Sequence, residues 1–341
     1  MKQIKTVDAV GQTLCHDVTC IVKDEYKGAL FRKGHVIEDS DIPRLLELGK
    51  EHVFIWEDDA DMLHENDAAR ILIKLCQSEN MTATEPKEGK MELIADVNGL
   101  LMVDTERLKK VNSSGEMMIA TRASGFPVKK GEKLCGARII PLVIDKAKME
   151  QVRESAGDEP LLKLLPIKPK KYGLINTGNE LFYGRIKDTF SPVIEEKLAQ
   201  YGCTQITKVT LEDNHEHITA AIKGMLESGA QMVLCTGGMS VDPDDKTPLA
   251  IKNAADKIIS YGAPVLPGAM FMLAYTTDGR PICGLPGCVM YHQRTIFDIV
   301  LPRLLADAPV TAEWIAGLGN GGLCLECENC VFPNCVFGKG V

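Results

Sequence analysis

The feature that most constrains this chain is a regular alternation of strand-like and helix-like runs in residues 172–236. Two runs carry apolar residues at helical spacing, one beginning at Ser191 and one around Ile218. Three runs are apolar or β-branched and typical of strands: 172–176, 204–211 and 231–235. This order predicts a parallel sheet with crossover helices. We therefore expect an α/β domain whose ligands bind beyond the carboxyl ends of the strands.

Polar and proline-containing stretches indicate where this domain begins and ends. Residues 78–91 and 154–171 break the apolar pattern, and prolines in the second stretch discourage a continuous helix or strand. Upstream we expect smaller mixed segments with short strands, among them 52–56 and 138–144. The expected division is a small β-rich domain at 1–80, an α+β segment with a linker at 81–165, the α/β domain at 166–310 and a cysteine-rich tail at 311–341.

The composition is that of an ordinary globular protein, with 45% hydrophobic and 25% charged residues among 341. The net charge of −8 argues against nucleic acid as the main partner, because affinity for phosphate backbones comes mostly from Lys and Arg. No apolar run approaches the roughly 18 residues that span a membrane. The first residues lack the apolar segment of a signal peptide, so we expect a cytoplasmic protein.

The densest group of candidate ligand-binding residues follows the third strand, where residues 236–248 read TGGMSVDPDDKTP. Gly237 and Gly238 let the backbone approach a ligand closely, and exposed amides near a helix start favour an oxyanion. Three nearby carboxylates would repel one another unless a hard cation, most simply Mg²⁺, lies among them. These carboxylates are Asp242, Asp244 and Asp245. The alternative is a polar loop with an aspartate N-cap ahead of a helix at Pro248.

Three further turns are expected at the same edge of the sheet. Residues 177–180 (TGNE) follow the first strand, and residues 212–214 (EDN) follow the second. Residues 284–288 (GLPGC) lie between a strand at 280–283 and a helix at 289–305. The last turn again presents glycine amides, although Pro-Gly turns by themselves are common.

Three cysteines lie at or near this edge. Cys235 and Cys283 end adjoining strands and are expected to be small buried hydrophobic residues. For Cys288 two interpretations stay open. It is either another buried residue or a thiolate at a helix start, which could bind a soft metal or carry sulfur.

In their order and spacing, these motifs resemble the molybdopterin-binding domain of the molybdopterin molybdenumtransferase family over residues 170–307. The resemblance rests on TGNEL at 177–181, Asp213, the loop at 236–247 and GLPG at 284–287. It implies a three-layer α/β fold that binds molybdopterin or adenylyl-molybdopterin. It also implies Mg²⁺ and molybdate, exchange of the adenylyl group for metal at the dithiolene, and a homodimer. A molybdoenzyme or a cofactor-assembly protein would be the partner.

The resemblance also assigns roles to individual residues. Glu180, Asp213 and Asp245 match acidic positions of the family and are expected to hold the cation and act as catalytic residues. The expected cofactor-binding residues are Thr177, Gly178, Asn179, Thr236, Gly237, Gly238, Ser240, Asp242, Asp244, Pro286, Gly287 and Cys288. Two of these depart from the family pattern, because Asp242 replaces a glycine and Cys288 replaces an asparagine.

The tail holds four cysteines with the spacing C-x2-C-x2-C-x4-C: Cys324, Cys327, Cys330 and Cys335. A reducing compartment disfavours disulfides, so the four are expected to bind metal. The spacing is close to that of ferredoxins and favours a 4Fe–4S cluster. Zinc and a disordered thiol tail are the alternatives. Glycines between 317 and 322 suggest a flexible hinge.

The sequence is therefore compatible with three functions. The first is a protein of molybdenum-cofactor biosynthesis that binds the pterin and acts as a transferase inserting molybdate. The second is a non-catalytic cofactor carrier or maturation factor with a redox-sensing iron–sulfur tail. It is favoured because the family segments SxMDGYA and TGAxxPxGADAVV have no counterpart in residues 1–165. The third, a nucleotide-pyrophosphate hydrolase of the competence-damage type, fits the loop after Gly238 less well.

Overall fold

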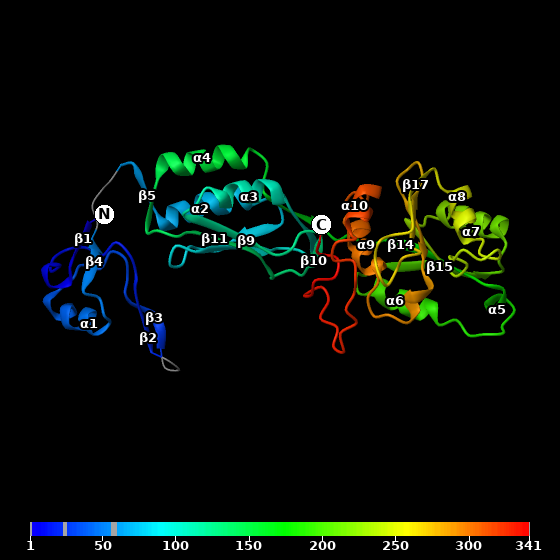
Figure 1. Ribbon diagram of the computed structural model, residues 1–341, viewed down its shortest axis with the longest axis horizontal. Helices are drawn as coiled ribbons and strands as arrows, with labels where there is room; N and C mark the ends of the chain where they lie inside the picture. The colour runs from blue at the N-terminus through cyan, green and yellow to red at the C-terminus, as the bar shows by residue number, and fades with distance from the viewer. Residues whose placement is uncertain (1, 23–25, 56–59, 341) are drawn as a thin grey trace. The chain divides into compact units, whose positions relative to one another are not determined.

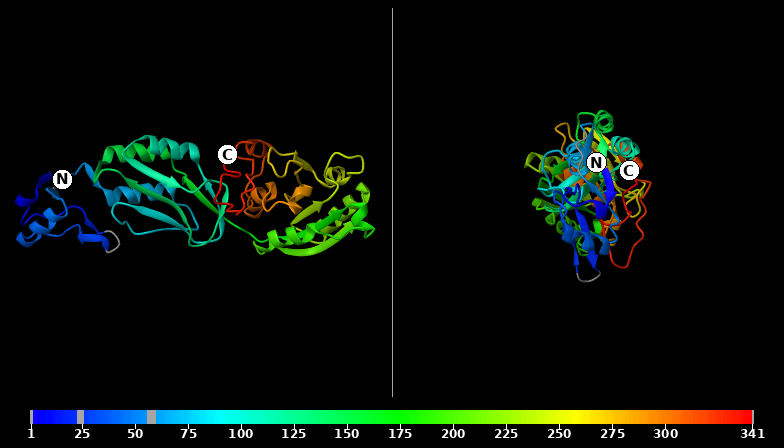
Figure 2. Two further views of the ribbon diagram at one scale, coloured as in Figure 1. Left: turned by 60° about the horizontal axis from the view of Figure 1, so that its bottom comes forward. Right: turned by 90° about the vertical axis from the view of Figure 1, so that its left-hand side faces the viewer.

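The computed structural model describes residues 2–22, 26–55 and 60–340, which form two compact units (Figures 1 and 2). The first unit comprises Met1–Ile94, Asp104–Thr121 and Lys133–Leu162. The second comprises Ala95–Val103, Arg122–Glu132 and Lys163–Val341. The four-part division expected from the sequence stays a prediction.

The second unit is built on a six-stranded sheet in the order β15-β14-β16-β19-β18-β17. Strands β15, β14, β16 and β19 are parallel neighbours, and β18 and β17 continue the sheet in antiparallel fashion. The strands are β14 (Lys171–Thr177), β15 (Thr204–Leu211), β16 (Met232–Thr236), β17 (Lys257–Tyr261), β18 (Met272–Tyr275) and β19 (Pro281–Leu285). The parallel half confirms the expected α/β class.

Helices cover both faces of this sheet and make three layers. The helices are α5 (Asn179–Phe182), α6 (Phe190–Ala199), α7 (His215–Glu227), α8 (Thr247–Ala254), α9 (Ile296–Leu305) and α10 (Ala312–Gly317). One apolar core joins the sheet to α6, α9 and α10, and a separate core joins it to α7 and α8. Two cores form because successive side chains of a strand point to opposite faces of the sheet. In β16, Leu234 lies in the first core, and its neighbours Val233 and Cys235 lie in the second.

The four parallel strands and the helices α6, α7 and α8 lie where the sequence predicts them, whereas β17, β18, α5 and α10 were not expected. The predicted helix at 289–305 is wrong at its start, because Gly287–Met290 forms a short 3₁₀ helix (η3) and α9 begins only at Ile296. Thr295 is the N-cap of α9 and forms a capping box with Asp298, so the helix has a fixed beginning there.

The first unit holds several separate strand pairings, among them a pair near the N-terminus and a four-stranded sheet. Strand β1 (Lys2–Lys5) pairs with β4 (His52–Ile55), next to the helix α1 (Ile42–Glu47). A four-stranded sheet has the order β6-β7-β11-β9, and its strands are β6 (Met81–Ala83), β7 (Met91–Ala95), β9 (Met117–Thr121) and β11 (Lys133–Ile139). The other helices of the first unit are α2 (Glu65–Cys76), α3 (Thr105–Ser113) and α4 (Lys146–Ala156).

Two expectations for the upstream segments are wrong in part, and a third extends beyond the described residues. The strand expected at 138–144 is interrupted, because β11 ends at Ile139 and β12 (Val143–Asp145) pairs separately with β5 (Met62–His64). The stretch 154–171, expected to be a loop, contains β13 (Leu162–Pro166). Of the strand expected at 52–56, Trp56 lies outside the described residues.

The tail packs against the rest of the second unit and does not hang from a flexible hinge. Leu323 forms a parallel bridge with Leu266, and the Cys324 amide donates to the Leu266 carbonyl at 2.8 Å. Gly322 is buried, and a Cβ on it would collide with backbone carbonyl oxygens. The predicted hinge is therefore wrong for the described residues, because these glycines allow close backbone packing.

Candidate functional site

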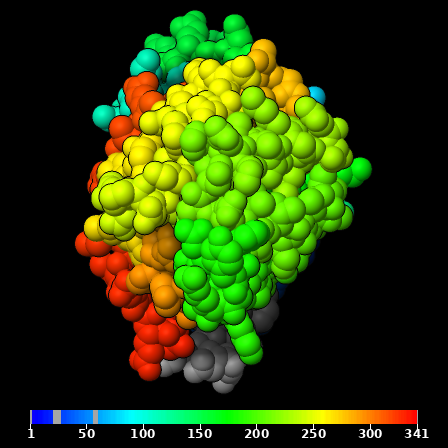
Figure 3. All heavy atoms as spheres, turned by 90° about the vertical axis from the view of Figure 1, so that its right-hand side faces the viewer, coloured from blue at the N-terminus to red at the C-terminus, as the bar shows by residue number. Residues whose placement is uncertain are grey.

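A pocket of about 640 Å³ opens at the carboxyl ends of the parallel strands. Its wall is made by four segments: 237–245 after β16, 266–270, 286–292 after β19, and 323–326 of the tail. Figure 3 shows two of them from outside, with the tail in red beside the orange segment that follows β19. A concave site at this edge is where such sheets bind small ligands.

Eight residues predicted from the sequence line this pocket: Gly237, Gly238, Ser240, Asp242, Asp245, Pro286, Gly287 and Cys288. They come from the turns after β16 and β19, which are neighbouring parallel strands. Their adjacency follows from the sheet topology, because successive turns of parallel neighbours meet at one edge.

The predicted residues after β14 and β15 form a second cluster next to the pocket. The Asn179 amide donates to Asp213 Oδ2 at 3.0 Å, and the Asp213 amide donates to Asn179 Oδ1 at 3.3 Å. The Gly178 amide donates to the Leu211 carbonyl at 3.2 Å. Glu180 lies in the same turn, on the exposed helix α5. These reciprocal bonds lock two strand ends together.

Threonines join this cluster to the glycine loop. The hydroxyls of Thr177 and Thr247 lie 3.0 Å apart, and the Thr247 amide donates to the Gly238 carbonyl at 3.3 Å. Thr236, buried at the end of β16, donates its hydroxyl to Asn176 Oδ1 at 2.8 Å. Its side chain therefore holds the strand end and does not line the pocket.

Asp213 is a carboxylate of this cluster whose negative charge is poorly compensated. Its Oδ1 is buried and has no hydrogen-bond partner among the described residues. Burial, followed by the charges of Glu180, Asp245 and Asp244, raises the pKa of Asp213 above its usual value. The unpaired oxygen and the surrounding negative charge both favour a proton, a cation or a hydrogen-bond donor at this position.

The carboxylates do not, however, form a finished cation site. Across the described ranges, no three His, Cys, Asp or Glu side chains are gathered closely enough to hold a metal ion. The orphaned Asp213 oxygen fits a cation, but Asp242 and Asp244 are exposed on the loop. The described geometry therefore supports no step through Mg²⁺.

The alternative expectation for this loop, an aspartate N-cap ahead of the helix at Pro248, is wrong for Asp245. The N-cap of α8 is Lys246, and no side chain caps that helix. The Asp245 carboxylate instead accepts the Asp242 amide at 3.3 Å, while the Asp245 amide donates to the Asp242 carbonyl at 3.0 Å. Asp245 therefore closes the loop on itself and faces the pocket.

Burial shapes the cysteines at the sheet edge. It raises the pKa of Cys288, which lines the pocket. Cys235 and Cys283 are fully buried in the two cores, and burial raises the pKa of Cys235 to about 12. These two behave as the small hydrophobic residues expected from the sequence.

The tail cysteines are brought together in part. Cys324, Cys327, Cys330 and Cys335 all line one cavity of about 220 Å³. Cys324 and Cys335 are half-buried, whereas Cys327 and Cys330 are exposed. Like the carboxylates, these four thiols do not yet form a metal-holding group within the described part of the chain.

Sequence reasoning missed about half of the pocket wall. The missed residues are Met239, Leu266, Pro267, Gly268, Ala269, Met270, His292, Leu323, Cys324 and Glu326. Segment 266–270 connects antiparallel strands and carries no binding motif, apart from a Pro-Gly pair. Cys324 was assigned to the tail, and only the bridge between Leu323 and Leu266 places it at the pocket.

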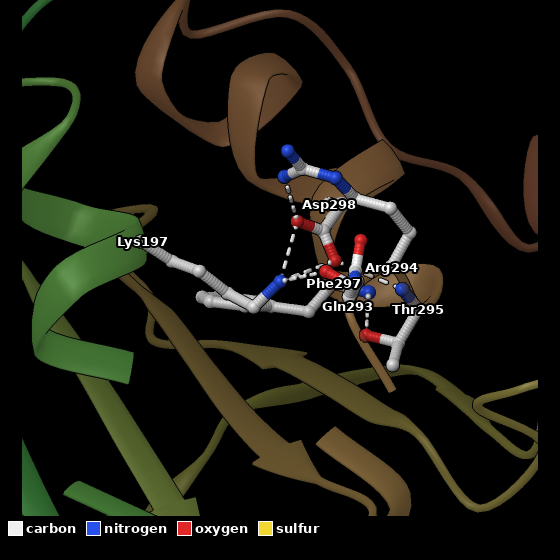
Figure 4. A network of polar contacts seen from close by, with 6 residues as sticks. All are labelled: Lys197, Gln293, Arg294, Thr295, Phe297 and Asp298. Atoms are coloured by element: carbon white, nitrogen blue, oxygen red, sulfur yellow. Dashed lines mark hydrogen bonds and ion pairs between the residues drawn. The ribbon is translucent and has the colours of Figure 1, made fainter. Parts of the chain in front are cut away.

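A buried ionic network positions the segment between η3 and α9 (Figure 4). Lys197 Nζ lies 2.7 Å from Asp298 Oδ1, with both side chains more than 90% buried. Lys197 also donates to the Gln293 carbonyl at 2.8 Å, and Arg294 donates to Asp298 at 2.9 Å. The Thr295 amide donates to the second Asp298 oxygen at 2.8 Å. One carboxylate thus anchors α6, α9 and a pocket-lining segment.

Fold and pocket together define an α/β domain with a candidate ligand pocket, and comparison with known proteins names the family of this domain. Residues 173–306 match the family described as "Probable molybdopterin binding domain" and form a domain of that family. The sequence had indicated 170–307 for the same resemblance. Residues 3–57 match a separate domain of unknown function, DUF8806.

Curated relatives match only in part. A molybdopterin molybdenumtransferase of Synechococcus elongatus is 25% identical over 196 residues, which are 54% of this chain and 46% of that protein. A CinA-like protein of Deinococcus deserti is 34% identical over 109 residues, 31% of this chain and 26% of that protein. The chain thus spans less than half the length of these relatives.

Solved structures are similar to part of the chain. The molybdopterin biosynthesis enzyme MoaB of Thermus thermophilus is 21% identical, with a TM-score of 0.34, and covers 40% of this chain and 91% of that one. The tungsten cofactor synthesizing protein MoaB of Pyrococcus furiosus is 22% identical, with a TM-score of 0.32, and covers 36% and 84%. Among the described helices, none is long and apolar enough to cross a membrane.

The raised pKa of Asp213 predicts a pH-dependent stability. A carboxyl whose folded pKa is raised stabilises the fold below its usual pKa, about 3.9, and this contribution is lost as the pH rises through the folded value. Asp213→Asn should therefore raise the free energy of unfolding at pH 7 by about 1 kcal/mol and change it little at pH 3. Urea unfolding at the two pH values measures the difference.

Asp188→Asn is the control for this prediction. Burial raises the pKa of Asp188, but hydrogen bonds donated by Ser191 and by the Phe190 amide outweigh it and lower the pKa. The neutral variant should accordingly lose stability at pH 7. If both variants changed stability in the same direction, the electrostatic account of Asp213 would be wrong.

Proposed function

We propose that this chain binds molybdopterin or adenylyl-molybdopterin in the pocket beyond β16 and β19 and acts in molybdenum-cofactor biosynthesis. The observation that carries the proposal is the joining of the Gly237-Gly238 and Pro286-Gly287 turns in one pocket at the carboxyl edge of the sheet. Their backbone amides suit a phosphate, and the pocket of about 640 Å³ is large enough for a small organic ligand.

The domain family supports a pterin ligand, and the transferase relative supports a transferase reaction. If a Mg²⁺ ion takes part, Asp213 and Asp245 would be the residues that hold it, and its charge would offset that of the phosphate. The homodimer and the molybdate substrate come from the resemblance alone and stay predictions.

A non-catalytic carrier is the second candidate. Two observations favour it: the missing family segments in residues 1–165, and the absence of an assembled group of metal-binding side chains within the described ranges. A carrier needs the pocket but not the cation. The two candidates therefore differ in whether AMP is released when adenylyl-molybdopterin, Mg²⁺ and molybdate are supplied.

Binding should depend on Asp245 if a cation and a phosphate share the pocket. In calorimetric titration with adenylyl-molybdopterin, Asp245→Ala should weaken binding by roughly tenfold to a thousandfold in Mg²⁺ and change it little in EDTA. The reason is that Asp245 would act through the cation, which EDTA removes.

Glu196→Gln is the matched control, because Glu196 is an exposed carboxylate on α6 away from the pocket wall. Its affinity should equal that of the unaltered chain in both buffers. Equal affinities for Asp245→Ala and Glu196→Gln in Mg²⁺ would contradict the cation-dependent site. Failure of the unaltered chain to bind either pterin form would contradict the proposed function as a whole.

A further inference from the structure

The cavity that holds the four tail cysteines lies between the tail and the segment that follows η3. Its other wall residues include His292, Arg294, Glu326 and Phe332. The proposed pterin function uses none of the four thiols as metal ligands. The four cysteines that line this one cavity therefore have a role separate from the proposed pterin binding.

The loop that carries these cysteines is closed at its base. The Gly338 amide donates to the Gly321 carbonyl at 2.9 Å, and the Cys324 amide donates to Leu266. Phe337 is buried in the domain core, and Phe332 contacts it edge-on with ring centroids 6.1 Å apart. Because both ends of the loop are held, a small movement of its exposed middle changes the distances between the thiols.

The four cysteines form two pairs that differ in solvent exposure. Cys324 and Cys335 pack on the domain core, whereas Cys327 and Cys330 are exposed. Closure would bring the exposed pair toward the anchored pair across the cavity. Four thiolates within twelve positions can then surround one metal centre.

Cationic side chains beside the cavity would offset part of the thiolate charge. Arg294 interacts with both Asp298 and Cys330, and its guanidinium lies 5.3 Å from the centre of the Phe332 ring. Lys339 lies near Cys335.

We propose that Cys324, Cys327, Cys330 and Cys335 hold one thiolate-bound metal centre, an iron–sulfur cluster or a zinc ion, which forms part of the wall of the pterin pocket. The structure links the two cavities directly, because His292, Leu323, Cys324 and Glu326 line both of them. His292 Nδ1 and Glu326 Oε1 lie 3.2 Å apart at this shared wall.

Metal binding should therefore change the pterin pocket. A metal at Cys324 and Cys327 restricts the segment between them, which includes Glu326 and follows the Leu323–Leu266 bridge. If the bound metal already orders this wall, less conformational entropy is lost when a ligand binds in the pocket. This coupling rests on the proposed function, whereas the metal centre itself does not.

The first experiment measures metal on the full chain. After anaerobic purification we expect either iron and acid-labile sulfide, about four of each per chain, with broad visible absorption, or about one zinc. Cys330→Ser should reduce the bound metal by roughly tenfold or more, because it removes one ligand. Cys330 is exposed, so its replacement should leave the fold intact.

Cys203→Ser is the matched control, since Cys203 is a thiol of the same unit outside the tail. It should keep the metal. Iron with sulfide identifies a cluster, and zinc alone identifies a zinc site. A chain without metal as purified, which also binds added Zn²⁺ no more tightly than Cys330→Ser, would overturn the proposal.

The second experiment tests the coupling first without the pterin and then with it. Hydrogen exchange should slow in residues 320–338 and in 266–270 of the metal-loaded chain compared with Cys330→Ser, because the Cys324 and Gly322 backbone groups bond to Leu266. Adenylyl-molybdopterin should then bind more weakly to Cys330→Ser. Unchanged exchange at 266–270 would overturn the shared wall. Absent pterin binding with normal metal loading would overturn the proposed function and leave the metal centre standing.

Discussion

Asp298→Ala is expected to lower the free energy of unfolding by about 3–5 kcal/mol, because it leaves the buried Lys197 ammonium without its counter-charge. Lys197 would keep only the Gln293 carbonyl, and Arg294 would lose its carboxylate partner. The capping box of α9 would be lost as well, since the Thr295 amide donates to Asp298. Urea unfolding monitored by circular dichroism measures the change.

Glu195→Ala provides the comparison. Glu195 pairs with Lys208 at 3.1 Å, but both side chains are more than a third exposed. Exposed ion pairs contribute about 1 kcal/mol or less, so this variant should be nearly as stable as the unaltered chain. Similar losses in the two variants would show that burial does not decide the effect at Asp298.

Gly237→Ala is the second substitution with a large expected effect. Gly237 has a φ of +83°, and a Cβ on it would overlap the carbonyl oxygen of Thr177 on the adjacent strand. Because that oxygen belongs to the backbone, it can move only if β14 and β16 separate. We expect a loss of more than about 3 kcal/mol in the free energy of unfolding, or failure to fold.

Gly184→Ala separates the two causes of this loss. Gly184 also has a positive φ, +69°, but a Cβ there would meet nothing within 4 Å. Its replacement should cost only the backbone strain, about 1–2 kcal/mol. A loss at Gly237 no larger than this would mean that the close approach to Thr177 is relaxed in solution.

The α/β domain was predictable because its information is local. Each strand of the parallel half is a short apolar run, and each crossover helix has its apolar residues on one face. Strand β15 was expected at 204–211 and is found there, and the helix expected from Ser191 is α6. The carboxyl-edge site followed from the order of these elements, because parallel strands place every following turn at the same edge of the sheet.

The break before α9 was not predictable from the apolar pattern alone. Residues 289–305 are apolar enough for one continuous helix. The helix α9 begins later because its N-cap Thr295 forms a capping box with Asp298, and Asp298 also pairs with Lys197 of α6. The partner that fixes this carboxylate lies 101 positions away in the chain. Long-range ion pairs of this kind leave no trace in local periodicity.

The sequence by itself determined the parallel sheet, its edge, the glycine turns at 237–238 and 286–287, and the grouping of four cysteines in the tail. Only the tertiary structure decided that the turns after β14 and β15 form a cluster beside the pocket, and that Leu323 and Cys324 become part of the pocket wall. The physical reason is that spacing along a strand or a short loop is set by neighbouring residues. The contact of the tail with Leu266 depends instead on backbone hydrogen bonds between segments more than fifty residues apart.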